Sequence, residues 1–221
     1  TTMESTILSW ICFLPMIGMG LILLAPKGNQ TVIRGIALVA TGIPFVLATW
    51  FYFSGFEKGV ADMQAVQRFD WIPMIGAQYY VGIDGLSVAL VFLTTLLLFL
   101  AVPASFSIAK AEKAYYALLL LLEVGILGVF ISLDYFLFYV FWEIMLLPMY
   151  FLIGIWGGPR REYAAIKFFL YTLAGSVLML IAVVALRLDS GTFAIPEMMA
   201  MAESGALTGA SLPGGGELLG M

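Results

Sequence analysis

The chain of 221 residues is too apolar to be a soluble protein. Hydrophobic residues make up 62% of it, charged residues make up 11%, and the mean hydropathy is +1.05. Such values are typical of integral membrane proteins that cross the bilayer several times. The formal net charge of −4 says little about partners, because most of the charges must lie in short loops.

Residue types exclude most redox and metal chemistry on this chain. Cys12 is the only cysteine, which excludes a disulfide framework and a cysteine-ligated iron–sulfur or zinc cluster. There is no histidine, which excludes histidine-ligated haem and most metal catalysis. The glycines near Gly214 follow no predicted strand, so they do not form a phosphate-binding loop. We therefore expect no cofactor and no metal on this chain.

Six apolar runs are long enough to cross a bilayer as helices, because about 20 residues span its roughly 30 Å hydrocarbon core. The sequence predicts an all-α integral membrane protein with a bundle over residues 1–188. The predicted helices cover residues 7–25, 32–53, 83–106, 114–133, 134–156 and 163–186. The longest connection covers residues 54–82, and residues 189–221 form an acidic, Gly/Ala-rich tail with a short helix from Pro196 to Glu203.

The fifth run, residues 134–156, carries one carboxylate, Glu143, near its middle. An ionised group at that depth costs at least ~2.5–3.5 kcal/mol, so intramembrane acids usually face protein or water and have a function. Pro148 lacks a backbone donor and frees a carbonyl beside the acid. Tyr139 and Tyr150 share the helical face of Glu143. The pattern predicts a proton-handling site at Glu143; the alternative is an acid that a neighbouring helix satisfies to fix packing.

Glu123 is a second candidate for proton transfer, in the middle of the fourth run, with Tyr116 on its face. Gly125 and Gly128 lie on the opposite face, where small residues let another helix approach closely. We therefore expect the fourth helix to pack on two sides and Glu123 to avoid lipid. Both a functional and a packing role for Glu123 remain open.

Lys167, one turn into the sixth helix, is a candidate for proton uptake. It lies about 6 Å from the same end of the bundle from which Glu143 is about 20 Å away. A lysine stem does not cover that difference, so we expect Lys167 to reach the interface or a chain of water. A direct partner of Glu143 is not evident in these residues.

Loop charges predict the orientation of the bundle. Basic residues concentrate in or beside the first, third and fifth connections, and fewer lie in the others. The cytoplasmic side is the side with more Lys and Arg in short loops. The N-terminus and the C-terminal tail are then outside. The first group is Lys27, Arg34, Lys110, Lys113, Arg160 and Arg161; the second is Lys58, Arg68 and Arg187.

Residues 138–176, FYVFWEIMLLPMYFLIGIWGGPRREYAAIKFFLYTLAGS, resemble the antiporter-like membrane subunits of respiratory complex I. They are most similar to the proton-translocating chain M, or mitochondrial subunit 4, family. VGIDGLS at residues 81–87 and LLLEVGILGVF at residues 120–130 are similar to it too. The resemblance implies that Glu143 is the family's fifth-helix glutamate of a proton half-channel.

The same resemblance implies a longer architecture, a bundle of about fourteen helices with two inverted repeats of five helices. This chain ends after its sixth span, inside the first repeat, and is an incomplete antiporter-like bundle. The partner lysine of the fifth-helix glutamate, the broken helix that bears it and the second repeat are not included. We therefore expect a fragment, a split gene product or part of a longer chain.

The resemblance further implies a proton-translocating subunit of an NADH:quinone oxidoreductase in the bacterial inner membrane, rather than a mitochondrial or thylakoid one. FMN, iron–sulfur clusters and quinone then belong to other subunits, and this chain has no redox centre. Its partners are other membrane subunits of complex I, including neighbouring antiporter-like subunits, and the bilayer, with no nucleic acid. Two alternatives stand: a sodium/proton antiporter or membrane-bound hydrogenase subunit of the same fold family, and a structural spacer without transport.

The predicted orientation can be tested by labelling single cysteines from outside intact cells, in a Cys12→Ser background. Gly59→Cys lies in the segment predicted outside and is expected to react with an impermeant maleimide. Ala111→Cys lies in a loop predicted in the cytoplasm and is expected to react only after permeabilisation. The reverse pattern would contradict the orientation.

Overall fold

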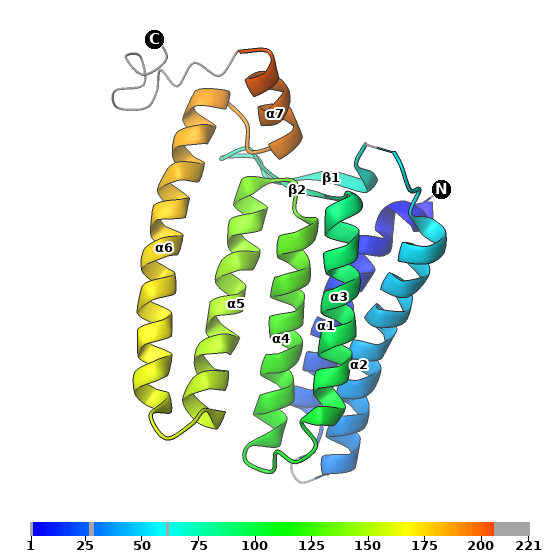
Figure 1. Cartoon of the computed structure of the whole chain (residues 1–221), viewed down its shortest axis with the longest axis vertical. Coiled ribbons are helices and arrows are strands. Elements are labelled where there is room, and N and C mark those ends of the chain that lie inside the picture. The colour runs from blue at the N-terminus through cyan, green and yellow to red at the C-terminus, as the bar shows by residue number, and fades with distance from the viewer. Residues whose placement is uncertain (1, 27–28, 61, 206–221) are drawn as a thin grey trace.

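Six long helices stand side by side and form most of the structure (Figure 1). The computed structural model describes residues 2–26, 29–60 and 62–205. All six helices are long and apolar enough to cross a membrane, which confirms the six predicted spans. They are α1 (Thr2–Leu24), α2 (Gln30–Trp50), α3 (Gly85–Ala104), α4 (Glu112–Ile131), α5 (Tyr135–Trp156) and α6 (Arg161–Ser190).

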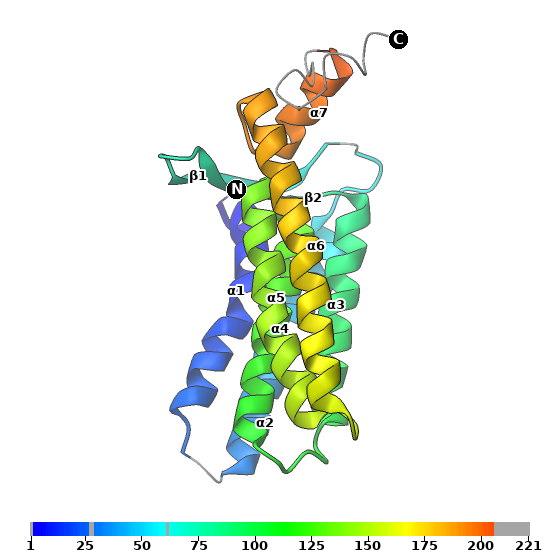
Figure 2. The same cartoon turned by 90° about the vertical axis from the view of Figure 1, so that its left-hand side faces the viewer.

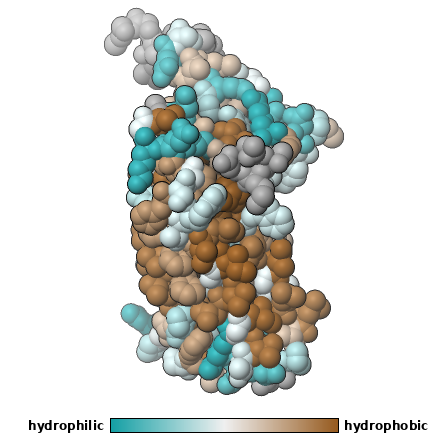
Figure 3. All heavy atoms as spheres, turned by 90° about the vertical axis from the view of Figure 1, so that its right-hand side faces the viewer, coloured by the Kyte–Doolittle hydropathy of each residue, from teal (hydrophilic) through white to brown (hydrophobic). Residues whose placement is uncertain are grey.

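Helix α4 lies at the centre of the bundle. It packs against α1 and α5 and more weakly against α2 and α3, whereas α6 packs against α5 at the edge (Figure 1). Over the apolar stretch of α4, 56% of the residues are buried, compared with 11% in α6. The exposed apolar side chains form a broad belt between two hydrophilic ends (Figure 3). This distribution is the one expected when hydrocarbon is the solvent around the middle of the bundle.

A β-hairpin lies across one end of the helices, within the connection of residues 54–82. Strands β1 (Gln64–Ile72) and β2 (Ala77–Ile83) pair antiparallel, and Gly76 in the turn has a φ of +73°, which glycine adopts without strain. Before the hairpin, α2 continues into one π-helical turn, η1 (Phe51–Gly55). The sequence analysis did not predict the hairpin, because the segment carries charged and aromatic residues without a clear alternation of period two.

Backbone hydrogen bonds join the α4–α5 turn to the hairpin on one side and to the start of α7 (Ile195–Glu203) on the other. The Leu133 N–H donates to the Tyr80 carbonyl at 2.8 Å, and the Ile195 N–H donates to the Leu133 carbonyl at 2.8 Å. We call this the hairpin end. The opposite end, where α1 ends and α2 begins, carries the loops at residues 105–111 and 157–160, and we call it the basic end. Helix α7 lies at the hairpin end, together with β1 and β2 (Figure 2).

Helix α7 shows that the predicted tail begins with ordered structure. Helix α6 continues to Ser190, past the predicted end at residue 186, and α7 forms where a short helix is predicted. Glu197 of α7 pairs with Arg68 of β1 at 2.7 Å, and accepts a hydrogen bond from Thr192. The Thr192 hydroxyl and then the Arg68 charge hold the pKa of Glu197 below its usual range. The rest of the predicted tail, residues 206–221, lies outside the described residues.

Asp134 connects α5 to the hairpin. Its Oδ1 accepts hydrogen bonds from the N–H groups of Phe136 and Leu137, both at 2.9 Å, and its Oδ2 accepts one from the Gln78 N–H at 3.1 Å. The side chain therefore caps the first turn of α5 and also binds β2. Burial raises the pKa of Asp134, and the three hydrogen bonds partly offset this effect.

We expect Asp134→Ala to lower the free energy of unfolding by about 1–2 kcal/mol, because it removes a helix cap and leaves the Gln78 N–H without its partner. Asp134→Asn keeps one carbonyl oxygen for the cap and should lose less. The thermal unfolding midpoint in a mild detergent measures both variants. An Ala variant as stable as the parent chain would show that the cap does not support α5.

Candidate functional site

Glu143 lies on the face of α5 that points away from α4. The opposite face of α5 carries Phe141 and Met145, which contact the Gly128 and Gly125 positions of α4. Residues two apart on a helix differ by roughly 160–200° in direction, so Glu143, between these two residues in sequence, faces the other way. The close approach predicted at Gly125 and Gly128 is confirmed, and α5 is the helix that makes it.

Helix α6 covers the Glu143 face of α5. The Tyr150 and Phe169 rings lie 5.6 Å apart, and the Tyr139 hydroxyl interacts with both Glu143 and Ser176 of α6. Because the two helices are antiparallel, these contacts set Glu143 level with residues 172–176 of α6. Ser176 is buried there. Tyr139 and Tyr150 thus share the face of Glu143, as the sequence predicts.

The carboxyl group of Glu143 has unused hydrogen-bonding capacity. Its Oε1 atom is buried and has no hydrogen-bond partner among the described residues, while the residue as a whole is partly exposed. A buried oxygen without a partner costs free energy if the group is ionised, so a cation, a proton or water is needed there. Pro148, one turn and a half along the helix, is buried as well.

Glu123 is fully buried on the other side of α4. Neither of its oxygens has a hydrogen-bond partner among the described residues, and it is near Cys12 of α1, whose thiol donates to the Val124 carbonyl at 3.7 Å. The prediction that α4 packs on two sides is therefore confirmed, with α1 on the Glu123 face and α5 on the glycine face.

The two acids lie at nearly the same depth but face opposite sides of the bundle. Gly125 is level with the stretch from Phe141 to Met145, so Glu123 and Glu143 differ by about two residues, or roughly 3 Å, along the helix axes. Glu123 faces α1, and Glu143 faces α6. The α4–α5 contact separates them, and the structure does not bring them together.

Lys167 does not contact Glu143. It lies on the exposed face of α6, with its Nζ 5.9 Å from the ring centre of Tyr163 and 5.8 Å from that of Tyr171. The α5–α6 contacts set it five to nine residues, or roughly 8–13 Å, from the level of Glu143. This placement agrees with the depth argument from the sequence.

An ion pair near the basic end was missed by the sequence analysis. The Arg34 Nε lies 2.5 Å from Glu112 Oε1, and Glu112 is only 6% exposed although the sequence places it in a loop. Tyr116, one turn further, is fully buried, and its hydroxyl has no partner among the described residues. Glu112, Tyr116 and Glu123 share one face of α4. The spacing of four and seven residues between Glu112, Tyr116 and Glu123 was the available signal. It was missed because the helix was predicted to start at residue 114, which left Glu112 outside it.

The polar groups inside the bundle are mostly carboxyls and hydroxyls. Within residues 2–26, 29–60 and 62–205, no group of three or more His, Cys, Asp or Glu is placed to hold a metal ion. Among the buried polar groups of the spans, carboxyls can bind and release protons, and hydroxyls can donate and accept hydrogen bonds. The buried carboxyl oxygens lie on α4 and α5, and the buried hydroxyls lie on α2, α3, α4 and α6.

Two family models match the chain. The one described as NADH-ubiquinone oxidoreductase chain 4, amino terminus, matches residues 65–134. The one described as NADH:quinone oxidoreductase/Mrp antiporter, TM, matches residues 132–216. Together they cover the hairpin and helices α3 to α7, including Glu123, Glu143 and Lys167.

Several known proteins are similar over most of this chain. NADH-quinone oxidoreductase subunit M of Rhodobacter capsulatus is 40% identical over 197 residues, which are 87% of this chain and 38% of that protein. NADH-ubiquinone oxidoreductase chain 4 of Marchantia polymorpha is 38% identical over 187 residues, 84% of this chain and 38% of that protein. The chain thus spans well under half the length of these curated relatives.

Solved structures agree in fold. A chain of respiratory complex I from Thermus thermophilus with bound NADH superposes with a TM-score of 0.73 and 30% identity, over 87% of this chain and 39% of that one. A chain of the Mrp complex from Dietzia sp. has a TM-score of 0.69 and 21% identity, over 85% of this chain and 20% of that one. The second likeness is one of fold alone.

The α4–α5 contact gives a prediction about stability. A side chain at Gly128 would collide with the Phe141 ring, so Gly128→Leu should destabilise the bundle by about 1–3 kcal/mol through overpacking. Gly175→Leu is the matched control, because nothing lies within 4 Å of a Cβ at that helical position. Thermal unfolding in detergent compares the two, and equal midpoints would contradict the importance of the contact.

Proposed function

Since this chain belongs to the family of antiporter-like membrane subunits that includes NADH-quinone oxidoreductase subunit M, we propose that it moves protons in an NADH:quinone oxidoreductase. It contributes to the enzyme as a membrane subunit without a redox centre. The FMN, the iron–sulfur clusters and the quinone belong to other subunits. The observation that carries the proposal is Glu143, an acid in mid-membrane with an oxygen that has no described partner.

Glu143 is the central proton carrier in this proposal. Its ionised form needs a cation or water nearby, because hydrocarbon and aliphatic side chains do not solvate a charge. When a cation supplied by a neighbouring helix approaches, the carboxyl releases its proton; when the cation withdraws, the carboxyl binds one again. A movement of charge driven elsewhere in the complex is thereby converted into proton capture and release. Tyr139 and Ser176 support this role, since the Tyr139 hydroxyl interacts with the carboxyl and the Ser176 hydroxyl interacts with that of Tyr139.

Glu123 and Lys167 have secondary roles in the same proposal. Glu123 is a second proton carrier on the α1 side of α4, with Tyr116 and Glu112 on its face toward the basic end. Lys167 is exposed near that end and assists proton uptake from water. The basic end faces the cytoplasm because the short loops there carry most of the basic residues.

The proposed setting is the bacterial inner membrane. The chain is a multi-pass membrane protein with six apolar helices, and subunit M of Rhodobacter capsulatus and of Rickettsia typhi are among its relatives. Its proposed partners are other membrane subunits of the same complex, among them neighbouring antiporter-like subunits. The poorly buried helix α6 supports such a neighbour, because 30 residues of mostly apolar helix pack only against one edge of the described bundle.

A cation antiporter is the second candidate function. It is favoured by the family description that joins quinone oxidoreductase to Mrp antiporter, and by the fold shared with the Mrp complex of Dietzia sp.. The higher identity to subunit M and chain 4 proteins favours the oxidoreductase. Dependence of transport on sodium rather than on NADH oxidation would favour the antiporter.

The test is proton pumping relative to electron transfer in membrane vesicles. Glu143→Gln keeps the volume and hydrogen bonding of the side chain but does not titrate, so coupled pumping should fall by at least ~10²-fold, the usual contribution of a positioned acid–base group. Glu143→Asp keeps the carboxyl on a shorter stem and should retain part of the pumping. Glu123→Gln should lower the pumping ratio less than Glu143→Gln.

Assembly has to be checked on a native gel for each variant. A Glu143→Gln variant that assembles and pumps at the parent ratio would identify Glu143 as a packing residue. The chain would then be a structural spacer, the third reading that the sequence leaves open.

A further inference from the structure

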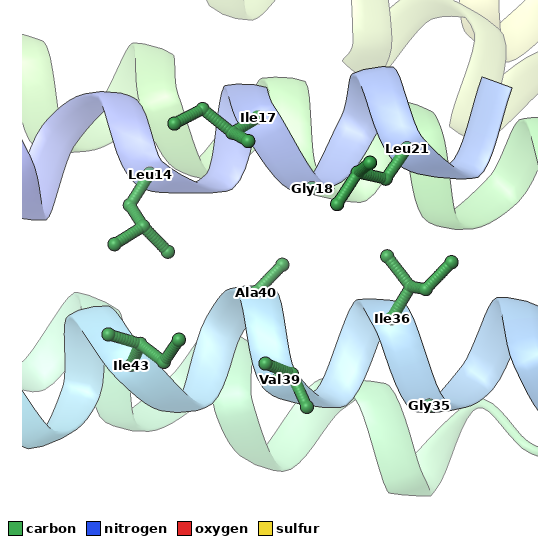
Figure 4. A pocket seen from close by; sticks show the side chains of 9 residues that line it. All are labelled: Leu14, Ile17, Gly18, Leu21, Gly35, Ile36, Val39, Ala40 and Ile43. Atoms are coloured by element: carbon green, nitrogen blue, oxygen red, sulfur yellow. The ribbon is translucent and has the colours of Figure 1, made fainter. Parts of the chain in front are cut away.

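An apolar groove runs between α1 and α2 on the outside of the bundle (Figure 4). It has a volume of about 430 Å³, and all of its lining residues are aliphatic or glycine. Leu14, Ile17 and Leu21 line it from α1, and Ile36, Val39 and Ile43 line it from α2, with small residues between the two rows (Figure 4).

Small residues create the hollow. Gly18 of α1 lies against Ala40 of α2 so closely that a Cβ at position 18 would collide with the Ala40 side chain. The two backbones therefore approach each other there, and the larger side chains on either side stand above this floor. At Gly35, nothing lies within 4 Å of a Cβ position, so the groove stays open toward the basic end.

The groove lies at the depth of the hydrocarbon core. Its residues fall inside the membrane-spanning stretches Thr6–Leu24 and Gln30–Gly55. Two of the lining side chains, Ile17 at 56% and Val39 at 59%, are among the exposed aliphatic residues of these helices. From Leu14 to Leu21 the groove follows α1 for roughly 10 Å along the helix axis.

We infer that this groove binds an acyl chain of a membrane phospholipid, and that the lipid phosphate lies at the basic end. An acyl chain runs along the helices as the groove does, and it needs no hydrogen-bond partner, which the groove does not offer. A helix about 10 Å wide would lie over the groove rather than fill it. A groove left empty would lose dispersion contacts along its whole length.

A positive charge near the basic end of α1 fits the phosphate. The Lys113 Nζ donates to the carbonyl of Ala25, one turn beyond Leu21, at 2.8 Å, so an ammonium group stands at this end of α1. Lipid tails are as apolar as leucine, so binding depends on shape and on the head group rather than on the hydrophobic effect. Such a lipid would lie against both α1 and α2, on the face of α1 that points away from Cys12.

Photochemical crosslinking in vesicles tests the inference with the full chain. The vesicles contain phosphatidylethanolamine and phosphatidylglycerol with a trace of phosphatidylglycerol that carries a diazirine in the middle of one acyl chain. Mass spectrometry of the irradiated protein locates the adducts. We expect them to concentrate on residues 14–21 and 35–43.

Two glycines provide a matched pair of variants. Gly35→Leu fills the groove, whereas Gly20→Leu adds the same side chain to a helical glycine that does not line it; neither position has an atom within 4 Å of a new Cβ. Adducts in the groove should fall several-fold in Gly35→Leu and stay at the parent level in Gly20→Leu. If Gly35→Leu does not accumulate, Val39→Trp replaces it, with the exposed Val46→Trp as its control.

Three results would overturn the inference. The first is an even distribution of adducts around the apolar belt, which means bulk lipid only. The second is an equal yield in the groove-filling variant and its control. The third is that the groove loses its lipid adducts when a photoreactive isoprenoid quinone or a neighbouring subunit is added, and crosslinks to that quinone or subunit instead.

Discussion

The contact between α4 and α5 determines the arrangement of the ionisable groups inside the bundle. Gly125 and Gly128 let the Met145 and Phe141 side chains lie directly against the α4 backbone. Without side chains at these two positions, the helices approach at the level of both acids. Each acid is thereby turned away from the contact, so that Glu123 faces α1 and Glu143 faces α6. Two carboxyls at one depth can then change protonation without repelling each other at close range.

At the hairpin end of the bundle, a second set of contacts holds the helices in register. Asp134 binds the start of α5 and the Gln78 N–H of β2, and the Leu133 backbone bonds to both the hairpin and the segment before α7. Arg68 and Glu197 add an ion pair between the hairpin and α7. The basic end is joined mainly through side chains, among them the pair of Arg34 and Glu112.

Much of the fold follows from the sequence because the bilayer imposes one strong rule. Every backbone group in hydrocarbon needs an internal partner, so an apolar run of 20 residues is a helix, and all six runs obey this. Glu143 and its face could be predicted for the same reason, since a charge in such a run is costly. The hairpin could not, because it lies outside the hydrocarbon, where water satisfies loops equally well.

The partners of the buried polar groups were harder to predict than the helices. Ser176 of α6 lies beside Tyr139 because of the position of α6 along the axis of α5. The close approach of Gly154 of α5 to Ala165 of α6 helps to fix that position. The pairing of Arg34 with Glu112 depends on α4 starting two residues earlier than its apolar run. Residue pattern and spacing predict which face of a helix carries a residue, but not the position of the neighbouring helix along the common axis.

The length of α6 restricts how it can move next to Glu143. Its 30 residues extend roughly 45 Å, compared with roughly 30 Å for the 20 residues of α4, and it rises past the end of α5 (Figure 1). Hydrophobic mismatch of this size is relieved by tilt or by protrusion from the bilayer. The Arg187 guanidinium near the protruding end, over the Phe193 ring, would enter hydrocarbon if α6 slid inward by a few turns. Vertical sliding of α6 is thus opposed at about 2.5–3.5 kcal/mol.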